Sequence, residues 1–533
     1  MVDARPLSVL IAQNAAFSSL RFLAGLVSAL LTAILVARHL GPQEFGTYRL
    51  ALSLIWVLEF VSSLAFPNAT AKFVAELSGG PTRAPVSVVV RFFLVRATAL
   101  WLGGFAVLLV VRHPLARFYR DEALASLLLL AAVAVLPGLW AGLLSAGLQG
   151  SQRFGALGVI GLVQAVATLL GSMLVVGLGG GVRDLLLLAI GVNGLWVMLA
   201  AVASRREPGL AAASGGLAPE LRARMWRYSL LVGATALTGA LLSERLEIFF
   251  LGRFWNTAEV GFYSLAMTLA YHARRQIPSA IGEVLFPVIA RLHGAGDAWG
   301  VRNAFVHATR YLAIAGFALG LGGAVCAEPL LTLLFGPAYR SATPTLAILF
   351  AATGVISLSH PATSIILSAE RHRFLLTSSV LVALANVLLD LLLIPRYAAV
   401  GAGLANAITH TVLLVVQMAA VSRWLATGLP LGNLARILAA ASGAWLPAAA
   451  FRAWPVLGES LDFGLGVACF VLLYPLLLAA SGALLDEDVV RLRALSQRLP
   501  ASGRTVAGGL LRTLSACGSY RRSSTGSARD IGV

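Results

Sequence analysis

The stretch "HLGPQEFGTYRLA", His39–Ala51, returns in altered form later in the chain as "FWNTAEVGFYSLA", Phe254–Ala266. Each stretch follows one long apolar run and precedes another, a pattern typical of a turn between two helices. Four residues recur at one constant spacing: Glu44 and Glu259, Gly46 and Gly261, Tyr48 and Tyr263, Ala51 and Ala266. A single such turn would indicate only a helix hairpin, but its recurrence in register indicates two similar halves.

The residue types of the repeated turn suit a hairpin at a membrane surface. We expect its glycine to relieve backbone strain where the chain reverses. The glutamate lies near the start of the next helix, where a carboxylate favours the helix dipole. The tyrosine belongs at the level of the lipid headgroups, with its ring in apolar surroundings and its hydroxyl in water.

The composition excludes a soluble globular protein. The 533 residues are 59% hydrophobic and only 12% charged, whereas soluble domains contain about 25% charged residues. Apolar runs recur along the whole chain, and each is long enough to cross a hydrocarbon core of about 30 Å. We therefore predict an all-α integral membrane protein with about fourteen transmembrane helices. The first run continues past Ala37, so we expect no cleavable signal peptide. The predicted spans are 10–38, 46–67, 86–111, 122–147, 155–179, 184–204, 225–252, 259–284, 305–326, 342–368, 374–394, 398–422, 435–453 and 461–485.

The loops predict the orientation through the positive-inside rule. If the N-terminus is cytoplasmic, arginine is much more frequent in the loops assigned to the inside, although the outer loop with Arg112, Arg117 and Arg120 runs against the trend. The bias predicts that both termini are cytoplasmic. It also accounts for the net charge of +17, which we attribute to membrane topology rather than to nucleic-acid binding.

The repeat divides the chain into segments. We predict two six-helix bundles, and because six is even, both bundles begin on the same side of the membrane. They are then parallel repeats related by an axis along the membrane normal. Three scattered cysteines, with no ligand spacing, predict no metal site and no cofactor. The predicted segments are 1–204, an N-terminal six-helix bundle; 205–224, a cytoplasmic linker; 225–425, a C-terminal six-helix bundle; 426–486, two additional transmembrane helices; and 487–533, a basic, partly disordered cytoplasmic tail.

Three stretches resemble one family. They are "ARHLGPQEFGTYRLALSL" near the start, "LEIFFLGRFWNTAEVGFYSLA" in the middle and "LLLIPRYAAVGAGLANAI" further on. In this order, over residues 10–425, they resemble the oligosaccharide flippases of bacterial polysaccharide biosynthesis, whose superfamily also holds the multidrug and toxic-compound extruders and the lipid II flippase. The resemblance implies a V-shaped pair of six-helix bundles in the bacterial inner membrane, alternating between inward-open and outward-open forms.

The same resemblance implies a substrate and a role. The substrate would be an undecaprenyl-diphosphate-linked oligosaccharide repeat unit, moved from the cytoplasmic to the outer leaflet for exopolysaccharide or lipopolysaccharide biosynthesis. Membrane lipids would surround the protein, and a partnership with the polysaccharide polymerase machinery stays open.

Ionisable residues inside the predicted spans are the candidates for function, because a central charge costs about 2.5–3.5 kcal/mol to insert. Arg21 lies roughly 16 Å into the first span by helical rise, beyond easy reach of either interface. The candidate substrate-binding residues are Arg21, Arg49, Arg96 and Arg245. The candidates for ion coupling or charge pairing are Glu59, Glu244 and Glu247. No residue is predicted to be catalytic.

Two interpretations of these residues stay open. In the first, Arg21 and Arg96 face a water-filled chamber between the two halves and bind the diphosphate, whose oxygens a guanidinium group contacts in a two-pronged fashion. In the second, Arg21 or Arg96 forms an internal ion pair with Glu59.

Other polar residues have a structural interpretation. Asn386 and Asp390 share a helix face and are predicted to hydrogen-bond a neighbouring helix. Arg310, near the inner start of a helix, is expected to extend its side chain to the membrane interface.

Two other functional classes compete with the flippase. A cation-coupled multidrug antiporter of the same superfamily needs an acidic and aromatic site, whereas arginines at depth favour an anionic substrate. A membrane glycosyltransferase or polymerase needs a positioned acid or base at a cleft. The sequence has no Gly-rich nucleotide loop, no paired carboxylates in a loop and no zinc spacing. We therefore predict a transporter rather than an enzyme.

Overall fold

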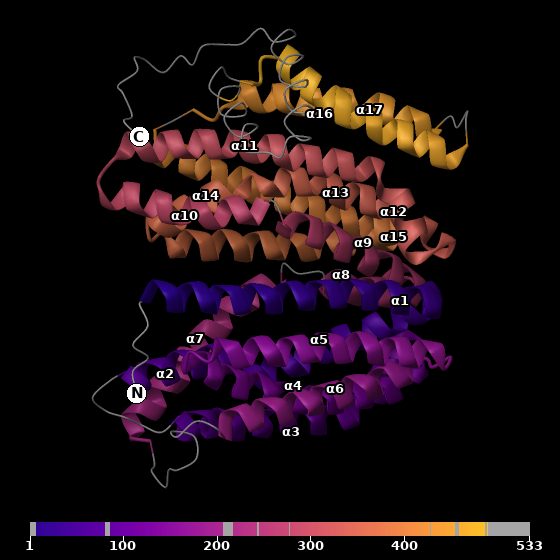
Figure 1. The fold of residues 1–533 in the computed structure, drawn as a ribbon. Coiled ribbons are helices and arrows are strands. Elements are labelled where there is room, and N and C mark those ends of the chain that lie inside the picture. Colours follow the sequence, from indigo (N-terminus) through magenta and orange to yellow (C-terminus); the bar gives the residue numbers. More distant parts are fainter. Residues whose placement is uncertain are drawn as a thin grey trace. The chain divides into compact units, whose positions relative to one another are not determined.

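The computed structural model describes residues 7–79, 86–205, 217–241, 245–276, 278–426, 428–453, 458–484 and 488, and every element among them is a helix (Figure 1). The helices are α1 Leu7–Ser63, α2 Phe66–Gly79, α3 Val86–Tyr119, α4 Ala123–Gly150, α5 Phe154–Gly177, α6 Val182–Arg205, α7 Pro219–Leu241, α8 Arg245–Phe254, α9 Thr257–Gln276, α10 Pro278–Gly294, α11 Ala298–Val325, α12 Ala327–Phe335, the 3-10 helix η1 Pro337–Ala342, α13 Thr343–Ser357, α14 Ser359–Ser368, α15 His372–Trp424, α16 Leu431–Ala453 and α17 Glu459–Ala480.

Ten helical stretches in the described part of the chain are long and apolar enough to span a membrane. Two of them, Phe17–Leu77 and His372–Trp424, are 61 and 53 residues long, whereas a single crossing needs about 20. Each contains a non-helical residue, Gly41 in α1 with φ 72° and Ala398 in α15 with φ 50°, and each covers two of the predicted spans. The all-helical, multi-pass membrane fold is confirmed, and the number fourteen stays a prediction.

The chain divides into two compact units. Unit 1 comprises Met1–Ser264, Leu334–Tyr339 and Asp390–Ala399, and unit 2 contains the remaining residues. The predicted bundles at 1–204 and 225–425 and their parallel repeat stay predictions. Residues 206–216 of the predicted linker and, apart from Asp488, the predicted tail at 487–533 lie outside the described residues.

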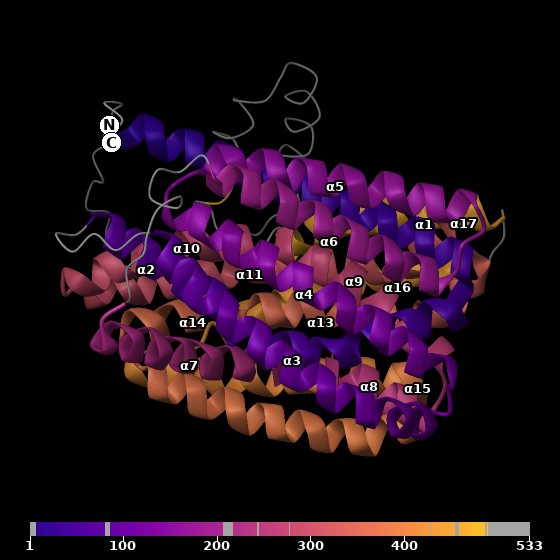
Figure 2. The ribbon, with the colours of Figure 1, turned by 90° about the horizontal axis from the view of Figure 1, so that it is seen from below.

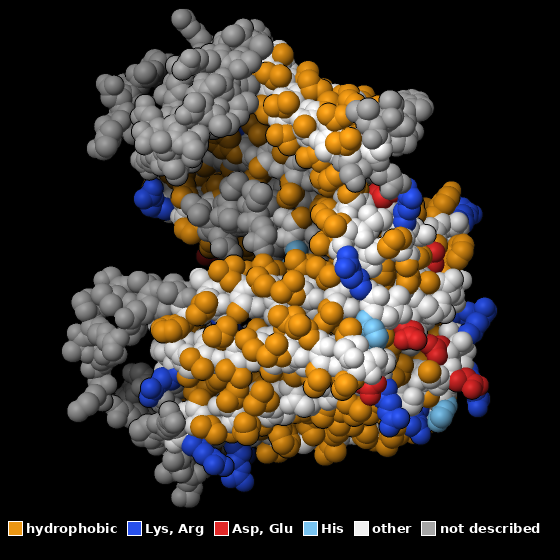
Figure 3. All heavy atoms as spheres, turned by 45° about the vertical axis from the view of Figure 1, so that its right-hand side comes forward, with side chains coloured by type: hydrophobic (Ala, Val, Ile, Leu, Met, Phe, Trp, Pro, Cys, Tyr) orange, Lys and Arg blue, Asp and Glu red, His pale blue; other side chains and the backbone are white. Residues whose placement is uncertain are grey.

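In unit 1, the helices from α1 to α6 run alongside one another. The first half of α1 packs along α5, and α4 packs against both α6 and α3, as the two views in Figures 1 and 2 show. At one end, α2, α3 and α7 share a core whose fully buried members include Phe66, Phe93 and Met225. The helix α7 begins at Pro219, and proline suits this position because the first helical N–H has no intrahelical partner. On the face of unit 1 shown in Figure 3, apolar side chains cover the middle and charged side chains gather toward the ends.

The two similar turns of the sequence contact each other in unit 1. A Cβ atom built on Gly46 would lie 1.6 Å from the carbonyl oxygen of Thr257, and one built on Gly261 would lie 2.4 Å from the carbonyl oxygen of Pro42. Glycine is therefore needed at both positions because the two backbones touch. The prediction that this glycine relieves strain at the reversal was wrong, since the positive φ belongs to Gly41 instead. We call the contact between these turns the crossing.

A buried tyrosine stabilises the crossing through a hydrogen bond and ring contacts. The Tyr339 side chain is 1% exposed, and its hydroxyl donates to the carbonyl oxygen of Ala37 at 2.9 Å. Its ring lies edge-on to Phe45 of the first turn and Phe262 of the second, with centroid separations of 6.5 and 6.2 Å. Tyr263 is also fully buried, so the prediction that its hydroxyl lies in water was wrong for the second turn, and its level in the membrane stays a prediction.

The crossing also fixes the kink in α15. The carboxylate of Glu259 accepts a hydrogen bond from the backbone N–H of Ala399 at 3.1 Å, directly after the non-helical Ala398. A backbone N–H that a kink removes from the helical ladder needs such a partner when it is buried. Trp255 adds a second tie by donating to the carbonyl oxygen of Ile394 at 2.7 Å.

In unit 2, α11 lies at the centre of the packing. It packs against α13, α14 and the hairpin of α16 and α17, and the hydroxyl of Tyr474 ties α17 to α11 by donating to the carbonyl oxygen of Ile314 at 2.8 Å. The last described residue, Asp488, returns to α11, where Arg310 and Tyr311 bind its carboxylate at 2.6 and 2.8 Å. Arg310 is 2% exposed, so the expectation that its side chain extends to the interface was wrong.

Candidate functional site

Arg21 lies on the exposed side of the contact between α1 and α5. Its side chain crosses α5 at Gly161, where an added Cβ would lie 2.4 Å from the Cγ and 3.2 Å from the Nε of Arg21. Four residues further along α5, Ala165 accepts a hydrogen bond from the buried Ser28 hydroxyl at 2.7 Å. The seam between the two helices is therefore fixed, and the glycine leaves a groove for the arginine stem.

The residues that follow Arg21 on α1 are apolar. Phe22 and Leu23 are 42% and 53% exposed, and they belong to the same apolar stretch of α1. A guanidinium group in these surroundings needs water, a counter-charge or a ligand anion. Arg21 is thus an exposed cation in a largely apolar stretch of α1.

The remaining candidates on α1 and α8 are less completely placed. Arg49 is half-buried and Glu59 is exposed, both in the second half of α1. Glu244 and the side chain of Arg245 lie outside the described residues, and so does the predicted shared face of Glu244 and Glu247. The roles of these residues stay predictions.

Two carboxyl groups are buried together in unit 1. Glu247 of α8 and Asp390 of α15 are both 0% exposed, and they interact electrostatically. Two buried carboxylates repel each other, so such a pair favours a proton or a cation between its members. Sequence reasoning missed the pair because its members are far apart in the chain.

The neighbouring Asn386 accepts a hydrogen bond from the Thr409 hydroxyl at 2.7 Å, as its predicted structural role requires.

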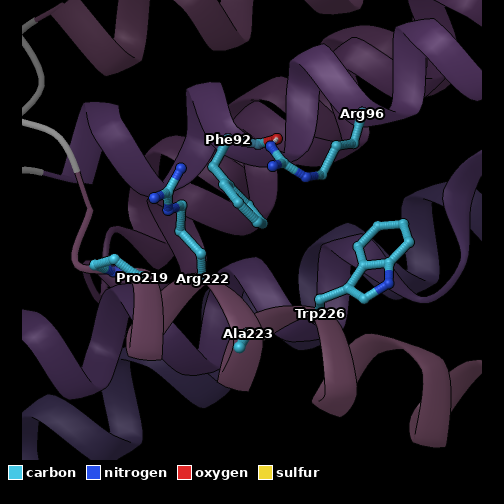
Figure 4. Close-up of a pocket in the computed structure, with 6 residues that line it drawn as sticks. All are labelled: Phe92, Arg96, Pro219, Arg222, Ala223 and Trp226. Atoms are coloured by element: carbon cyan, nitrogen blue, oxygen red, sulfur yellow. Dashed lines mark hydrogen bonds between the residues drawn. The ribbon is translucent and has the colours of Figure 1, made fainter.

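Arg96 lies in a pocket on α3 and α7. The cavity measures about 400 Å³, and Figure 4 shows the residues that line it: Phe92, Arg96, Pro219, Arg222, Ala223 and Trp226. Nη1 of Arg96 donates to the carbonyl oxygen of Phe92 at 2.9 Å, and its guanidinium carbon lies 3.4 Å from the centroid of the Phe92 ring. Arg222 acts electrostatically on Arg96. Nothing in the sequence pairs Arg222 with α3, so sequence reasoning did not select it as a site residue.

An ion pair holds α7 beside this pocket. Arg224 binds both carboxylate oxygens of Glu76 in α2, at 2.7 and 3.0 Å. Lys72 contacts the same carboxylate at 3.4 Å, and its ammonium nitrogen lies 4.2 Å from the centroid of the Phe73 ring. Arg224 is thus matched by a carboxylate, whereas none of the six described residues that line the pocket is acidic.

The fold is similar to those of several solved membrane transporters. It is similar to the lipid II flippase MurJ in an inward closed conformation, with a TM-score of 0.68 and 11% identity over 87% of this chain and 98% of that chain. It is also similar to an inward-facing multidrug resistance transporter of the MATE family and MOP superfamily, with a TM-score of 0.62 and 12% identity over 78% of this chain and 98% of that chain. At these identities the likeness shows the fold alone.

The sequence identifies the family. The profile of the polysaccharide biosynthesis protein family matches residues 35–344, which is more than half of the chain, and the chain belongs to this family. It is also 27% identical, over 131 residues, to the teichuronic acid biosynthesis protein TuaB of Bacillus subtilis (strain 168). That match covers 24% of this chain and 26% of the relative's length. The resemblance to polysaccharide flippases is confirmed.

Proposed function

We propose that this protein moves an undecaprenyl-diphosphate-linked oligosaccharide repeat unit from the inner to the outer leaflet of the bacterial inner membrane by alternating access. The observation that carries this proposal is the exposed Arg21, seated on Gly161 within an apolar helix pair. The polysaccharide family of the chain and the flippase among its structural neighbours support a saccharide-lipid cargo.

The chemistry of Arg21 suits a diphosphate. A guanidinium group is always charged and offers paired N–H donors to phosphate oxygens, whereas an ammonium group acts as a point charge. Arg49 and Arg245 would extend the same basic path along α1 and α8. These charged residues would bind only the diphosphate. The sugar units of the cargo need hydroxyl and amide partners, which the charged candidates do not supply.

The buried carboxyls supply a means of coupling. Glu247 and Asp390 would bind a proton or a cation in one state of the cycle and release it in another. A carboxyl pair is also what a cation-coupled multidrug antiporter would use, and the likeness to a MATE transporter fits that second candidate. The two candidates differ in the cargo that depends on Arg21.

The test is glycan export from a strain whose own copy is replaced by variants. We expect Arg21→Ala to lower export about tenfold to hundredfold, since losing a hydrogen bond to a charged group costs about 1.5–3 kcal/mol. Arg21→Lys should retain part of the activity because the charge stays. Arg91→Ala is the matched control, because Arg91 is exposed on α3 and does not line the pocket.

A second variant tests how Gly161 positions the Arg21 side chain, rather than the charge of Arg21. Gly161→Ala adds a methyl group 2.4 Å from the Arg21 Cγ, so it should displace the side chain and reduce export less than Arg21→Ala does. Gly103→Ala, at a glycine with open space around it, should have no effect. Normal glycan export by Arg21→Ala together with lost drug resistance would favour the antiporter.

A further inference from the structure

We propose that the pocket between α3 and α7 binds the phosphate group of an anionic membrane lipid, through Arg96 and Arg222. The pocket lies entirely within unit 1. Its residues come from α3 and α7, so it is a different site from the seat of Arg21 on α1 and α5.

The charges of the pocket call for an anion. Arg96 and Arg222 have the same charge, act on each other electrostatically and line one cavity of about 400 Å³. Figure 4 shows their guanidinium groups on either side of the Phe92 side chain. Like charges that line one cavity repel each other, and an anion that contacts both guanidinium groups converts the repulsion into two attractions. Pro219 lines the same cavity, so the pocket lies at the start of α7.

The position of Arg96 is fixed before any ligand arrives. One of its N–H groups bonds the carbonyl oxygen of Phe92, and its plane covers the Phe92 ring. A guanidinium group has five N–H donors in a rigid fork, so this anchoring leaves others for phosphate oxygens. Pre-positioning lowers the entropy lost on binding.

The walls of the pocket favour a lipid over free phosphate. Trp226 and Phe92 supply aromatic surface, and tryptophan is enriched where membrane proteins meet the headgroups. Val95, next to Arg96 on α3, is 59% exposed, and Leu230, one turn after Trp226 on α7, is 44% exposed. Exposed apolar residues one helical turn or less from a cationic pocket match an amphiphile with a phosphate head and an acyl or prenyl chain.

The experiment is native mass spectrometry of the full chain after delipidation. Phosphatidylglycerol, undecaprenyl diphosphate and inorganic phosphate are titrated separately, with phosphatidylcholine as a zwitterionic reference. We expect Arg96→Gln with Arg222→Gln to weaken lipid binding about hundredfold, at about tenfold for each charge-assisted contact. The matched control is Arg91→Gln with Arg227→Gln, two exposed arginines of the same helices outside the pocket. This control variant should change the affinity for the lipid by less than about threefold.

The arms of the experiment separate the possible ligands. Arginine-dependent binding of phosphatidylglycerol identifies a resident phospholipid, and selective binding of undecaprenyl diphosphate identifies the lipid of the transported cargo. Either result supports the site. Equal losses in the pocket and control variants, or arginine-dependent binding of inorganic phosphate alone, would overturn it.

A milder variant protects the test against misfolding. Arg222→Gln alone changes an exposed residue in the first turn of α7, so it should leave the melting temperature unchanged and still weaken lipid binding about tenfold. The inference does not depend on the proposed transport. Binding is measured without export, so loss of the flippase proposal through Arg21→Ala would leave this result standing, and the reverse also holds.

Discussion

At the crossing, α1 and α9 touch backbone to backbone, whereas beside the pocket α7 meets α2 and α3 through side chains, which form a shared apolar core with Met225 and an exposed ion pair. Both regions belong to unit 1. The crossing has glycine at its contact and a buried tyrosine bonded to a carbonyl oxygen. The pocket region has an ion pair between Arg224 and Glu76, whose side chains are 55% and 39% exposed, and a cavity beside it.

This difference indicates which helices of unit 1 can change their positions. Close-packed backbones leave no room for extra atoms, and neighbouring atoms shift only at a large cost in energy. Exposed ion pairs contribute about 0–1 kcal/mol and exchange readily with water. We therefore expect the crossing to stay fixed while α7 adjusts its position, and three substitutions test this expectation.

The largest effect should come from Gly46→Ala. The new methyl group would lie 1.6 Å from the Thr257 carbonyl oxygen, so the two turns must separate, at a cost of about 3 kcal/mol or more. The measurement is the yield and melting temperature of the protein solubilised from membranes.

The control is Gly25→Ala in the same helix, because that glycine has open space around it. It should match the wild-type protein. A Gly46→Ala protein with normal yield and melting temperature would show that the backbones are not in contact.

A smaller effect should follow from Tyr339→Phe. This change keeps the ring packing with Phe45 and removes the hydroxyl that bonds Ala37, which should lower the free energy of unfolding by about 1 kcal/mol. Denaturant unfolding in detergent measures it. Tyr397→Phe, at a side chain 55% exposed, should cost much less. If the two changes cost the same, the buried hydrogen bond does not fasten the crossing.

The smallest effect should come from Glu76→Gln in the pocket region. It breaks an exposed pair, so the free energy of unfolding should fall by less than about 1 kcal/mol. Asp488→Asn makes the same chemical change at a buried pair with Arg310 and should cost about 3 kcal/mol. Equal losses in the free energy of unfolding for Glu76→Gln and Asp488→Asn would contradict the expected difference between the exposed and the buried ion pair.

Sequence reasoning could predict the helices and the family but not how the helices meet. Apolar runs indicate the spans because the bilayer sets a minimum length for each crossing, and the repeated turn drew attention to Gly46 and Gly261. The reason for the glycine was wrong, because contact between two turns distant in sequence leaves no local signal. The same applies to Tyr263, whose amphipathic side chain suits an interface but is fully buried.

The candidate site shows the same limit. Arg21 could be selected because a charge in an apolar run is conspicuous, and the structure places it on an exposed face. Arg222 lies in a basic segment where any arginine fits the positive-inside rule, so its place beside Arg96 could not be read from the sequence. Arg310 has its carboxylate partner at Asp488, in the segment that follows the last membrane helix, and a pairing of that range needs a folded chain.

The cluster beside the pocket has a practical consequence. Lys72 is the only lysine in this sequence, and its side chain is 36% exposed next to Glu76. Amine-reactive dyes and cross-linkers therefore have a single side-chain target, located on the helix that α7 contacts. A fluorophore coupled there would report on the movement of α7 without any engineered cysteine.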